Sequence, residues 1–171
     1  MLRPSIIMQM RYLQATALMA FFSFPWSYAE AATVTGTFNV QVTIAATCAL
    51  NSASNLNFGT QGVLAANVDQ TSTITVTCTN TTPYNIGLDK GVNGGSVTTR
   101  QMKAAGPALI NYSLFSDAGR IVNWGQTIGT DTVAATGTGS AQPFTVFGRI
   151  PPQPSPLPAV YNDTITVTVT Y

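Results

Sequence analysis

Side chains able to do acid–base or nucleophilic chemistry are few in this chain. It contains no histidine, so neither a serine–histidine nor a cysteine–histidine nucleophile can be assembled. Asp131-Thr132 and Asp163-Thr164 resemble parts of an aspartic-protease dyad, but neither pair is followed by glycine. We expect Asp163 instead to cap the turn before the last strand. The sequence therefore predicts no catalytic residue, and a protein that is not an enzyme.

Two further motifs point only weakly to a ligand. The run from Lys90 to Gly95 is rich in glycine, but it lacks the Gly-Lys-Ser/Thr ending of a phosphate-binding loop. Trp124 could stack on a sugar, although packing in the core or between subunits explains it better. Scattered aspartates give no support for a metal site. We predict no cofactor, no metal and no small-molecule substrate.

The first residues have the features of a secretory signal peptide. Arg3 and Arg11 give a basic start, residues 13–24 form an apolar run, and Ala29-Glu30-Ala31 offers a cleavage site. The run is shorter than the roughly 20 residues that a membrane span needs. We predict that residues 1–31 are removed, with Met10 as an alternative start to Met1.

Two cysteines, Cys48 and Cys78, are the remaining reactive side chains. In an exported chain such a pair favours a disulfide over two free buried thiols. Cys48 shares the alternation phase of Ile44, and Cys78 that of Ile74 and Val76, so both sulfurs should face the core. Closing a loop of about 30 residues should contribute about 3–4 kcal/mol.

Charge excludes several classes of partner. Of seven basic and six acidic residues, loss of Arg3, Arg11 and Glu30 with the signal peptide leaves five of each. The expected net charge of zero argues against nucleic acid and against an anionic membrane surface. It leaves large neutral surfaces, which suit packing against other copies.

The elements that must position these residues begin with one long alternating stretch, residues 32–50. Apolar or small residues occupy every even position: Val34, Gly36, Phe38, Val40, Val42, Ile44, Ala46, Cys48 and Leu50. This is the period of a half-buried strand. As a single strand it would span about 55–60 Å, which is too long for a small β domain. Either the chain bends midway or part of the stretch belongs to another domain; an ordinary edge strand is the alternative for residues 34–44.

The rest of the chain predicts short strands separated by turns. The expected strands are 70–79, 84–88, 108–115, 143–150 and 164–171, with turns around a short strand in 125–139. In the last strand Ile165, Val167, Val169 and Tyr171 should face inward. No segment has a helical period, so we predict an all-β sandwich of immunoglobulin type. We count six strands once the first stretch is divided, and we expect the seventh to be missing because the last strand runs to the final residue.

The order of several motifs adds a resemblance to a known family. They are Asn57-Phe58-Gly59, Thr75-Val76-Thr77-Cys78-Thr79, Arg100-Gln101-Met102, Leu109 with Tyr112, Leu114 and Asp117, Trp124-Gly125, Thr145 to Pro151, and Tyr161-Asn162-Asp163-Thr164. The mature chain resembles the spore coat protein U domain family, whose best-known members are the major pilins of archaic (Csu-type) chaperone–usher pili. It departs at Phe147, where tyrosine is usual, and in a proline-enlarged loop in which Val160 replaces a usual glycine.

The resemblance implies donor-strand complementation. In this family the sandwich lacks its seventh strand, which is supplied in trans, first by a periplasmic chaperone and then, at an outer-membrane usher, by the next subunit. Residues 32–45 would be the donor extension and 46–171 the pilin domain. The donor residues would be Val34, Gly36, Phe38, Val40, Val42 and Ile44. The acceptor-groove edge strand would carry Ile165, Val167, Val169 and Tyr171.

Three functions remain open on these grounds. The first is a structural pilus subunit, exported through the periplasm to the cell surface, polymerised with other copies and serving adhesion and biofilm formation. The second is a secreted spore-coat-type structural protein. The third is an adhesin that binds a glycan or a surface directly.

Overall fold

The computed structural model describes residues 30–171. All but the last two residues of the predicted signal peptide, 1–31, lie outside this range. The chain divides into two units, residues 1–41 and 42–171, and in the first of them residues 30–41 form no strand. Across residues 30–171, no helix is long and apolar enough to cross a membrane.

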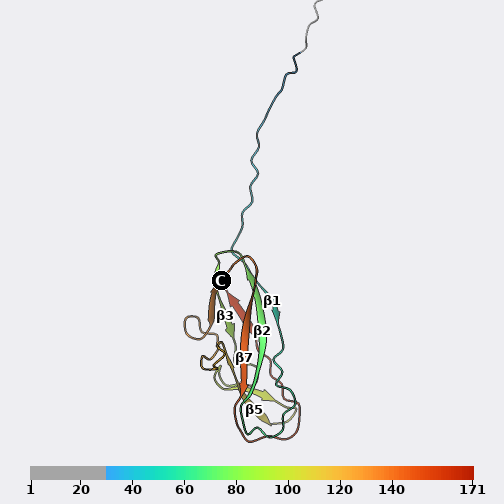
Figure 1. Ribbon diagram of the computed structural model, residues 1–171, viewed down its shortest axis with the longest axis vertical. Coiled ribbons are helices and arrows are strands. Elements are labelled where there is room, and N and C mark those ends of the chain that lie inside the picture. Colours follow the sequence, from blue (N-terminus) through green and yellow to red (C-terminus); the bar gives the residue numbers. More distant parts are fainter. Residues whose placement is uncertain (1–29) are drawn as a thin grey trace, which may run out of the picture. The chain divides into compact units, whose positions relative to one another are not determined.

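The second unit contains eight strands (Figure 1). They are β1 (Cys48–Ala53), β2 (Val68–Cys78), β3 (Pro83–Leu88), β4 (Arg100–Lys103), β5 (Leu109–Phe115), β6 (Val133–Thr136), β7 (Ala141–Ile150) and β8 (Val167–Thr170). The two beyond the six predicted are β4 and β6, each of four residues. Strand β6 lies where the sequence indicated a short strand between turns, whereas β4 was missed because four residues carry little periodic signal.

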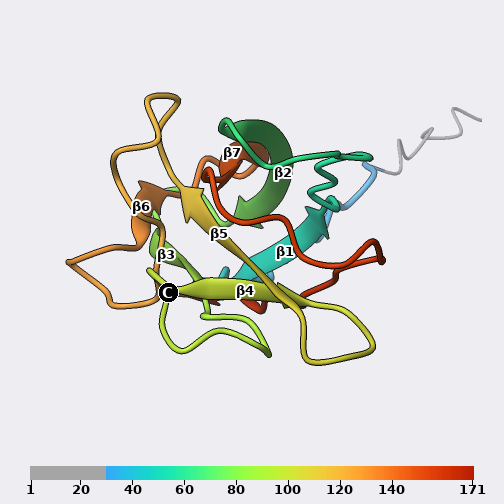
Figure 2. The same ribbon diagram turned by 90° about the horizontal axis from the view of Figure 1, so that it is seen from below.

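The strands form two antiparallel sheets. One has the order β1-β2-β7-β5-β4 and the other β6-β3-β8. Figure 2 shows β3 and β6 of the second sheet side by side. An immunoglobulin sandwich has strands A-B-E-D in one sheet and C-F-G in the other. Strands β1, β2, β7 and β5 take the places of A, B, E and D, and β3 and β8 those of C and F. The prediction of an all-β, immunoglobulin-like sandwich is confirmed, and no strand of residues 30–171 occupies the place of G.

Alternating residues of both sheets make the core. Ile74, Val76 and Cys78 of β2 face inward, where they meet Ile86 and Leu88 of β3, and all five are at most 2% exposed. The period-2 pattern seen in the sequence is therefore the pattern of burial. Threonine dominates the opposite face of β2, where a β-branched polar residue suits a pleated surface in water.

Trp124 and Arg100 lie inside the same core. The Trp124 side chain is 1% exposed, and its Nε1 donates a hydrogen bond to the Ile86 carbonyl at 2.8 Å. This placement confirms the interpretation of Trp124 as a packing residue. The guanidinium of Arg100 donates to four backbone carbonyls, those of Asp89, Val97, Leu88 and Trp124, at 2.7–2.9 Å. Burial lowers the pKa of Arg100, and the four acceptors pair with four of its five N–H donors inside the core.

The last strand is shorter than the sequence predicted. Its pairing with β3 ends with Asn85 opposite Thr170. Tyr171 lies beyond that pairing and is 60% exposed, so the prediction that it faces inward is wrong. Ile165, Val167 and Val169 are half-buried and pack on the core, as expected.

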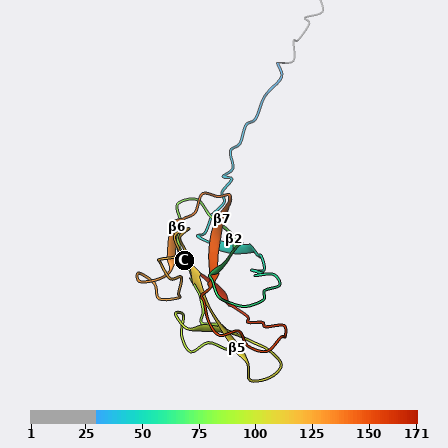
Figure 3. The same ribbon diagram turned by 60° about the horizontal axis from the view of Figure 1, so that its bottom comes forward.

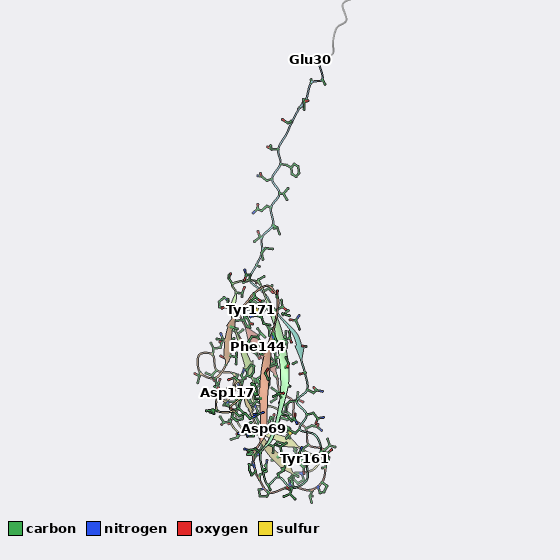
Figure 4. The ribbon with its side chains drawn as sticks, viewed as in Figure 1. Glu30, Asp69, Asp117, Phe144, Tyr161 and Tyr171 are labelled. Atoms are coloured by element: carbon green, nitrogen blue, oxygen red, sulfur yellow. A yellow bond between two sulfur atoms is a disulfide. The ribbon has the colours of Figure 1, made fainter. Side chains whose placement is uncertain are left out.

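The domain formed by the second unit has two opposite ends, which we call the β1-start pole and the proline-loop pole. At the β1-start pole lie Thr47, the turn 79–83, the turn 137–140 and the end of β8, joined by bonds such as Thr79 N to the Thr47 carbonyl at 2.9 Å and Gly139 N to the Cys78 carbonyl at 3.0 Å. At the proline-loop pole lie the loops 54–67, 104–108 and 151–162. Figure 4 shows Tyr171 and Tyr161 at these opposite ends.

Candidate functional site

The two sheets have four edge strands, β1 and β4 in one and β6 and β8 in the other, and the candidate site involves β1 and β8. Within residues 30–171, β1 is hydrogen-bonded only to β2, and β8 only to β3. These two edges belong to different sheets, and β1 and β8 come into contact on the same side of the domain. Each edge presents a row of unpaired backbone N–H and C=O groups, which form a template for another strand.

A groove of about 1140 Å³ opens on this side of the domain, where its lining includes Ala53 at the end of β1 and Val167 at the start of β8. Its side chains are mainly apolar, and they come from both sheets and from two long loops. They include Ala53, Leu56, Phe58, Leu64, Ile74, Leu88, Met102, Ile110, Leu114, Val146, Ile150, Leu157, Ile165 and Val167. An apolar floor between two unpaired edges fits a strand with alternating apolar side chains.

Several side chains that face inward are not fully covered on this side of the domain. Leu50 of β1 lies opposite Val76, so it shares the inward face, yet it is 44% exposed. Val167 and Val169 of β8 are only half-buried although they too face inward. In a closed sandwich a seventh strand would cover such side chains.

A disulfide holds the start of the β1 edge. Cys48 and Cys78 are bonded, with a sequence separation of 30 and a Cα–Cα distance of 4.0 Å. They are opposite each other in the β1–β2 register, so the predicted pairing is confirmed. Since β1 has one neighbouring strand, this bond is the covalent tie that keeps the edge in place.

Two carboxylates hold the segment that leads into β8. Asp163 Oδ1 accepts hydrogen bonds from the backbone N–H of Val92 at 3.0 Å and of Asn93 at 3.3 Å, and its Oδ2 accepts one from the Tyr112 hydroxyl at 2.7 Å. The expectation that Asp163 caps its own turn is therefore wrong, because it ties three separate parts of the chain together. Burial, together with the hydrogen bond and charge of Asp163, raises the pKa of Tyr112, so its hydroxyl stays a donor.

Asp89 makes the second tie. Its Oδ1 accepts from the N–H of Thr166 at 2.9 Å and of Gly91 at 3.0 Å. Burial opposes ionisation of this carboxyl, but the hydrogen bonds from Thr166 and Gly91 and the charge of Arg100 outweigh it, so its pKa is lowered. The start of the β8 edge is thus held in place by an ionised side chain.

Loop 54–64 is a groove element that sequence reasoning missed. Leu56 and Phe58 pack directly against β7 at Gly148, where a Cβ would meet Leu56 Cδ1 at 2.6 Å and Phe58 Cζ at 3.0 Å. Leu64 N donates to Ser155 Oγ at 2.8 Å, which joins this loop to the proline-rich one. The only available signal was the motif Asn57-Phe58-Gly59, because an irregular loop has no period to detect.

The predicted donor residues lie in a segment without secondary structure. Residues 30–47 form no strand, and the exposed fraction of the large apolar side chains runs from 74% at Ile44 to 95% at Val34. Their binding to a neighbouring subunit stays a prediction. Gly36 has nothing within 4 Å of the place where a Cβ would be.

The aspartates considered for catalysis have other partners. Asp131 Oδ1 accepts from the N–H of Thr127 at 2.6 Å, which closes its own turn, and Asp163 is engaged as described above. In residues 30–171 no three side chains of the types His, Cys, Asp or Glu lie close enough to hold a metal ion.

Comparisons with known proteins place this chain in a family. The model of the Spore Coat Protein U domain matches residues 34–168. The curated "Protein U" of Myxococcus xanthus is 31% identical over 172 residues, which cover 92% of this chain and 93% of that protein. One solved chain, from the CsuC–CsuE chaperone–tip adhesion subunit pre-assembly complex of archaic chaperone–usher Csu pili of Acinetobacter baumannii, has a TM-score of 0.54 and 24% identity, and the match covers 75% of this chain and 40% of that one. The chain belongs to the Spore Coat Protein U domain family.

Proposed function

We propose that this protein is a structural subunit of a surface pilus, and that residues 32–45 of one copy fill the groove of another. One observation carries the proposal: the free edges of β1 and β8 lie on the same side, where an immunoglobulin sandwich has its G strand, and a groove with a mainly apolar lining opens between the end of β1 and the start of β8. The role is one of assembly, and no catalytic step is assigned to the chain.

Residues 32–45, which we call the arm, have side chains that match the apolar lining of the groove. Val34, Phe38, Val40 and Val42 lie on one side of an extended chain, and threonine, asparagine and glutamine on the other. Burying four such side chains would contribute roughly 6–12 kcal/mol, from which the cost of ordering the arm is subtracted. Backbone hydrogen bonds to β1 and β8 would add to this, so a slowly dissociating filament is expected. Gly36 would leave one place on the groove floor unfilled.

The partners of the subunit follow from the same groove. An open apolar groove with two free edges invites aggregation, so a periplasmic chaperone would cover it after export. The fold match to a chain of a chaperone–subunit complex supports such a partner. Transfer at an outer-membrane usher to the arm of the next copy would then build a filament at the cell surface, where it serves adhesion and biofilm formation.

The test places one charge on each face of the arm, in the protein's own host. Phe38→Asp would put a carboxylate into the groove, whereas Asn39→Asp puts the same charge on the neighbouring, opposite face. We expect surface filaments to disappear from electron micrographs with Phe38→Asp and to persist with Asn39→Asp. Filaments in both variants would contradict the proposal.

A secreted coat protein is the second candidate. It is favoured by the family description and by 31% identity to Protein U over nearly the whole of both chains. The same arm and groove would then build a layer instead of a filament. Immunogold labelling separates the two functions, because the label would follow thin filaments in the first case and the surface of a coat in the second.

A further inference from the structure

An exposed apolar surface lies at the proline-loop pole. It consists of Val63, Leu157 and Val160, which are 84%, 77% and 77% exposed; we call it the proline-loop surface. All three residues also line the groove, so the surface continues the groove at this end. Three large apolar side chains held in water at one end of a domain suggest a contact with another protein.

Hydrogen bonds give this surface a fixed shape. The loop that carries Leu157 is tied to the loop that carries Val63 by Leu64 N to Ser155 Oγ at 2.8 Å and by Gln153 N to the Leu64 carbonyl at 3.0 Å. Tyr161 donates its hydroxyl to the Leu157 carbonyl at 2.7 Å. Little ordering is therefore needed when a partner binds, and this favours association.

The length of the linker after the arm limits where a donating domain can sit. The arm's last apolar residue is Ile44, and Thr47 is already fixed to its own domain, because its carbonyl accepts from Thr79 N and its N–H donates to Thr79 Oγ1. The three steps from Ile44 to Thr47 span at most about 11 Å. The donor's β1-start pole must therefore lie within about 11 Å of the place where Ile44 leaves the groove.

The direction of the arm decides which pole that is. An arm parallel to β8 would leave at the acceptor's β1-start pole. The β1-start poles of donor and acceptor would then meet, and the assembly would close as a dimer. An antiparallel arm would leave at the proline-loop pole, where the unlike contact produces an open-ended filament.

The groove favours the second direction. Towards the β1-start pole the groove lining reaches only to Ala53 of β1 and Val167 of β8, whereas at the other end it continues through residues 155–163. In Figure 3 the loop that follows β7, drawn in red, lies away from the C-terminus. Most exposed residues of the β1-start pole are polar or small, among them Asn80, Thr81 and Thr138, although Pro83 and Tyr171 are exposed there as well. Of the two poles, the one where an antiparallel arm would emerge carries the three exposed aliphatic side chains Val63, Leu157 and Val160.

We infer that the proline-loop surface is a second contact site for the following copy of this chain. Ile44, Ala45 and Ala46 of the donor leave the groove across Leu157 and Val160, and the donor's β1-start pole docks there. This inference rests on the proposed function and adds to it a surface outside the groove. It makes each junction of the filament a two-site contact.

Cysteine pairs test the inference in surface filaments from the protein's own host. Ala45→Cys combined with Leu157→Cys should give a ladder of covalent oligomers on non-reducing gels. Within one copy these positions lie at opposite poles, so the link can form only between copies. Ala45→Cys with Ile121→Cys is the matched control, because Ile121 is 83% exposed and belongs to neither pole. Ala45→Cys with Tyr171→Cys reports the parallel direction.

The outcomes separate the inference from the proposed function. A ladder with the Leu157 pair alone supports both. Filaments that depend on Phe38 but give no ladder with the Leu157 pair, or give one with the Tyr171 pair, overturn the inference and leave the proposed function standing. If no Phe38-dependent assembly exists, both fall.

A second measurement tests how much the proline-loop surface slows the release of subunits from the filament. Leu157→Ser with Val160→Ser should raise the rate of subunit release from filaments in denaturant at least tenfold, equal to about 1.4 kcal/mol. The matched control is Ile121→Ser with Ile128→Ser, which removes two other exposed apolar side chains and should leave the rate unchanged. Equal rates in the two double variants would contradict a docking role for the surface.

Discussion

Removing the Cys48–Cys78 disulfide should destabilise the domain by an amount that the chain length fixes. The bond closes a loop with a sequence separation of 30. The loop-entropy relation gives about 3.6 kcal/mol for a loop of this size, through the smaller freedom of the unfolded chain. That is a large part of the 5–15 kcal/mol typical of a domain.

The assay is equilibrium unfolding of the mature chain in urea, followed by tryptophan fluorescence. After the predicted cleavage Trp124 is the single tryptophan, and it is 1% exposed, so its emission should shift when the core opens. With a urea slope of about 1–3 kcal/mol/M, the midpoint of Cys48→Ala with Cys78→Ala should fall by about 1.2–3.6 M. The measurement is repeated at several protein concentrations, because assembly through the groove would also stabilise the fold.

Reduced wild-type protein is the control, since it loses the cross-link but keeps both sulfur atoms. Its midpoint should fall nearly as far as that of the double variant. If both midpoints stay within about 0.3 M of the oxidised wild type, the reasoning from loop entropy is refuted. A fall in the double variant alone would assign the effect to lost packing around Cys78.

Two further predictions concern the segment that leads into β8 and the β1-start pole. The lowered pKa of Asp89 means that its ties to Thr166 and Gly91 contribute stability fully above the ordinary value of 3.8 and lose it as the pH falls through the lower folded value. Urea midpoints measured from pH 7 down to pH 2 should therefore drop less steeply in Asp89→Asn, whose amide oxygen can still accept the hydrogen bonds; parallel curves would contradict this. At the β1-start pole, a Cβ on Gly137 would overlap the Thr79 carbonyl oxygen. Gly137→Ala should lower the melting temperature by several degrees, whereas Gly106→Ala, where the space is open, should cost less, and equal losses would argue against the overlap.

The fold class and the disulfide could be predicted because both depend on local pattern. Alternation along β2 placed Ile74, Val76 and Cys78 on one face, and the same phase placed Cys48 opposite them. A strand buried on one face must show this period, so the information is present in any window of a few residues. The family motifs added the expectation that one strand is missing.

Short and irregular elements could not be predicted in this way. Strand β4 has four residues and carries no readable period, and Tyr171 continued the alternation of the last strand although β3 has no residue paired with it. Asp163 was expected to act on its own turn, but its partners come from residues about 50 and 70 positions away. Contacts of that range depend on how loops meet, which local periodicity does not encode.

The sequence by itself determined that this is an all-β domain with one disulfide, few charges and an arm of alternating apolar residues. It did so because side-chain period, cysteine count and charge are properties of the chain alone. Only the tertiary structure decided that the free edges of β1 and β8 lie on one side, that loop 54–64 and the proline loop extend the groove between them, and that Val63, Leu157 and Val160 meet at its end. These features arise where segments distant in sequence pack together, and packing is settled by the folded chain as a whole.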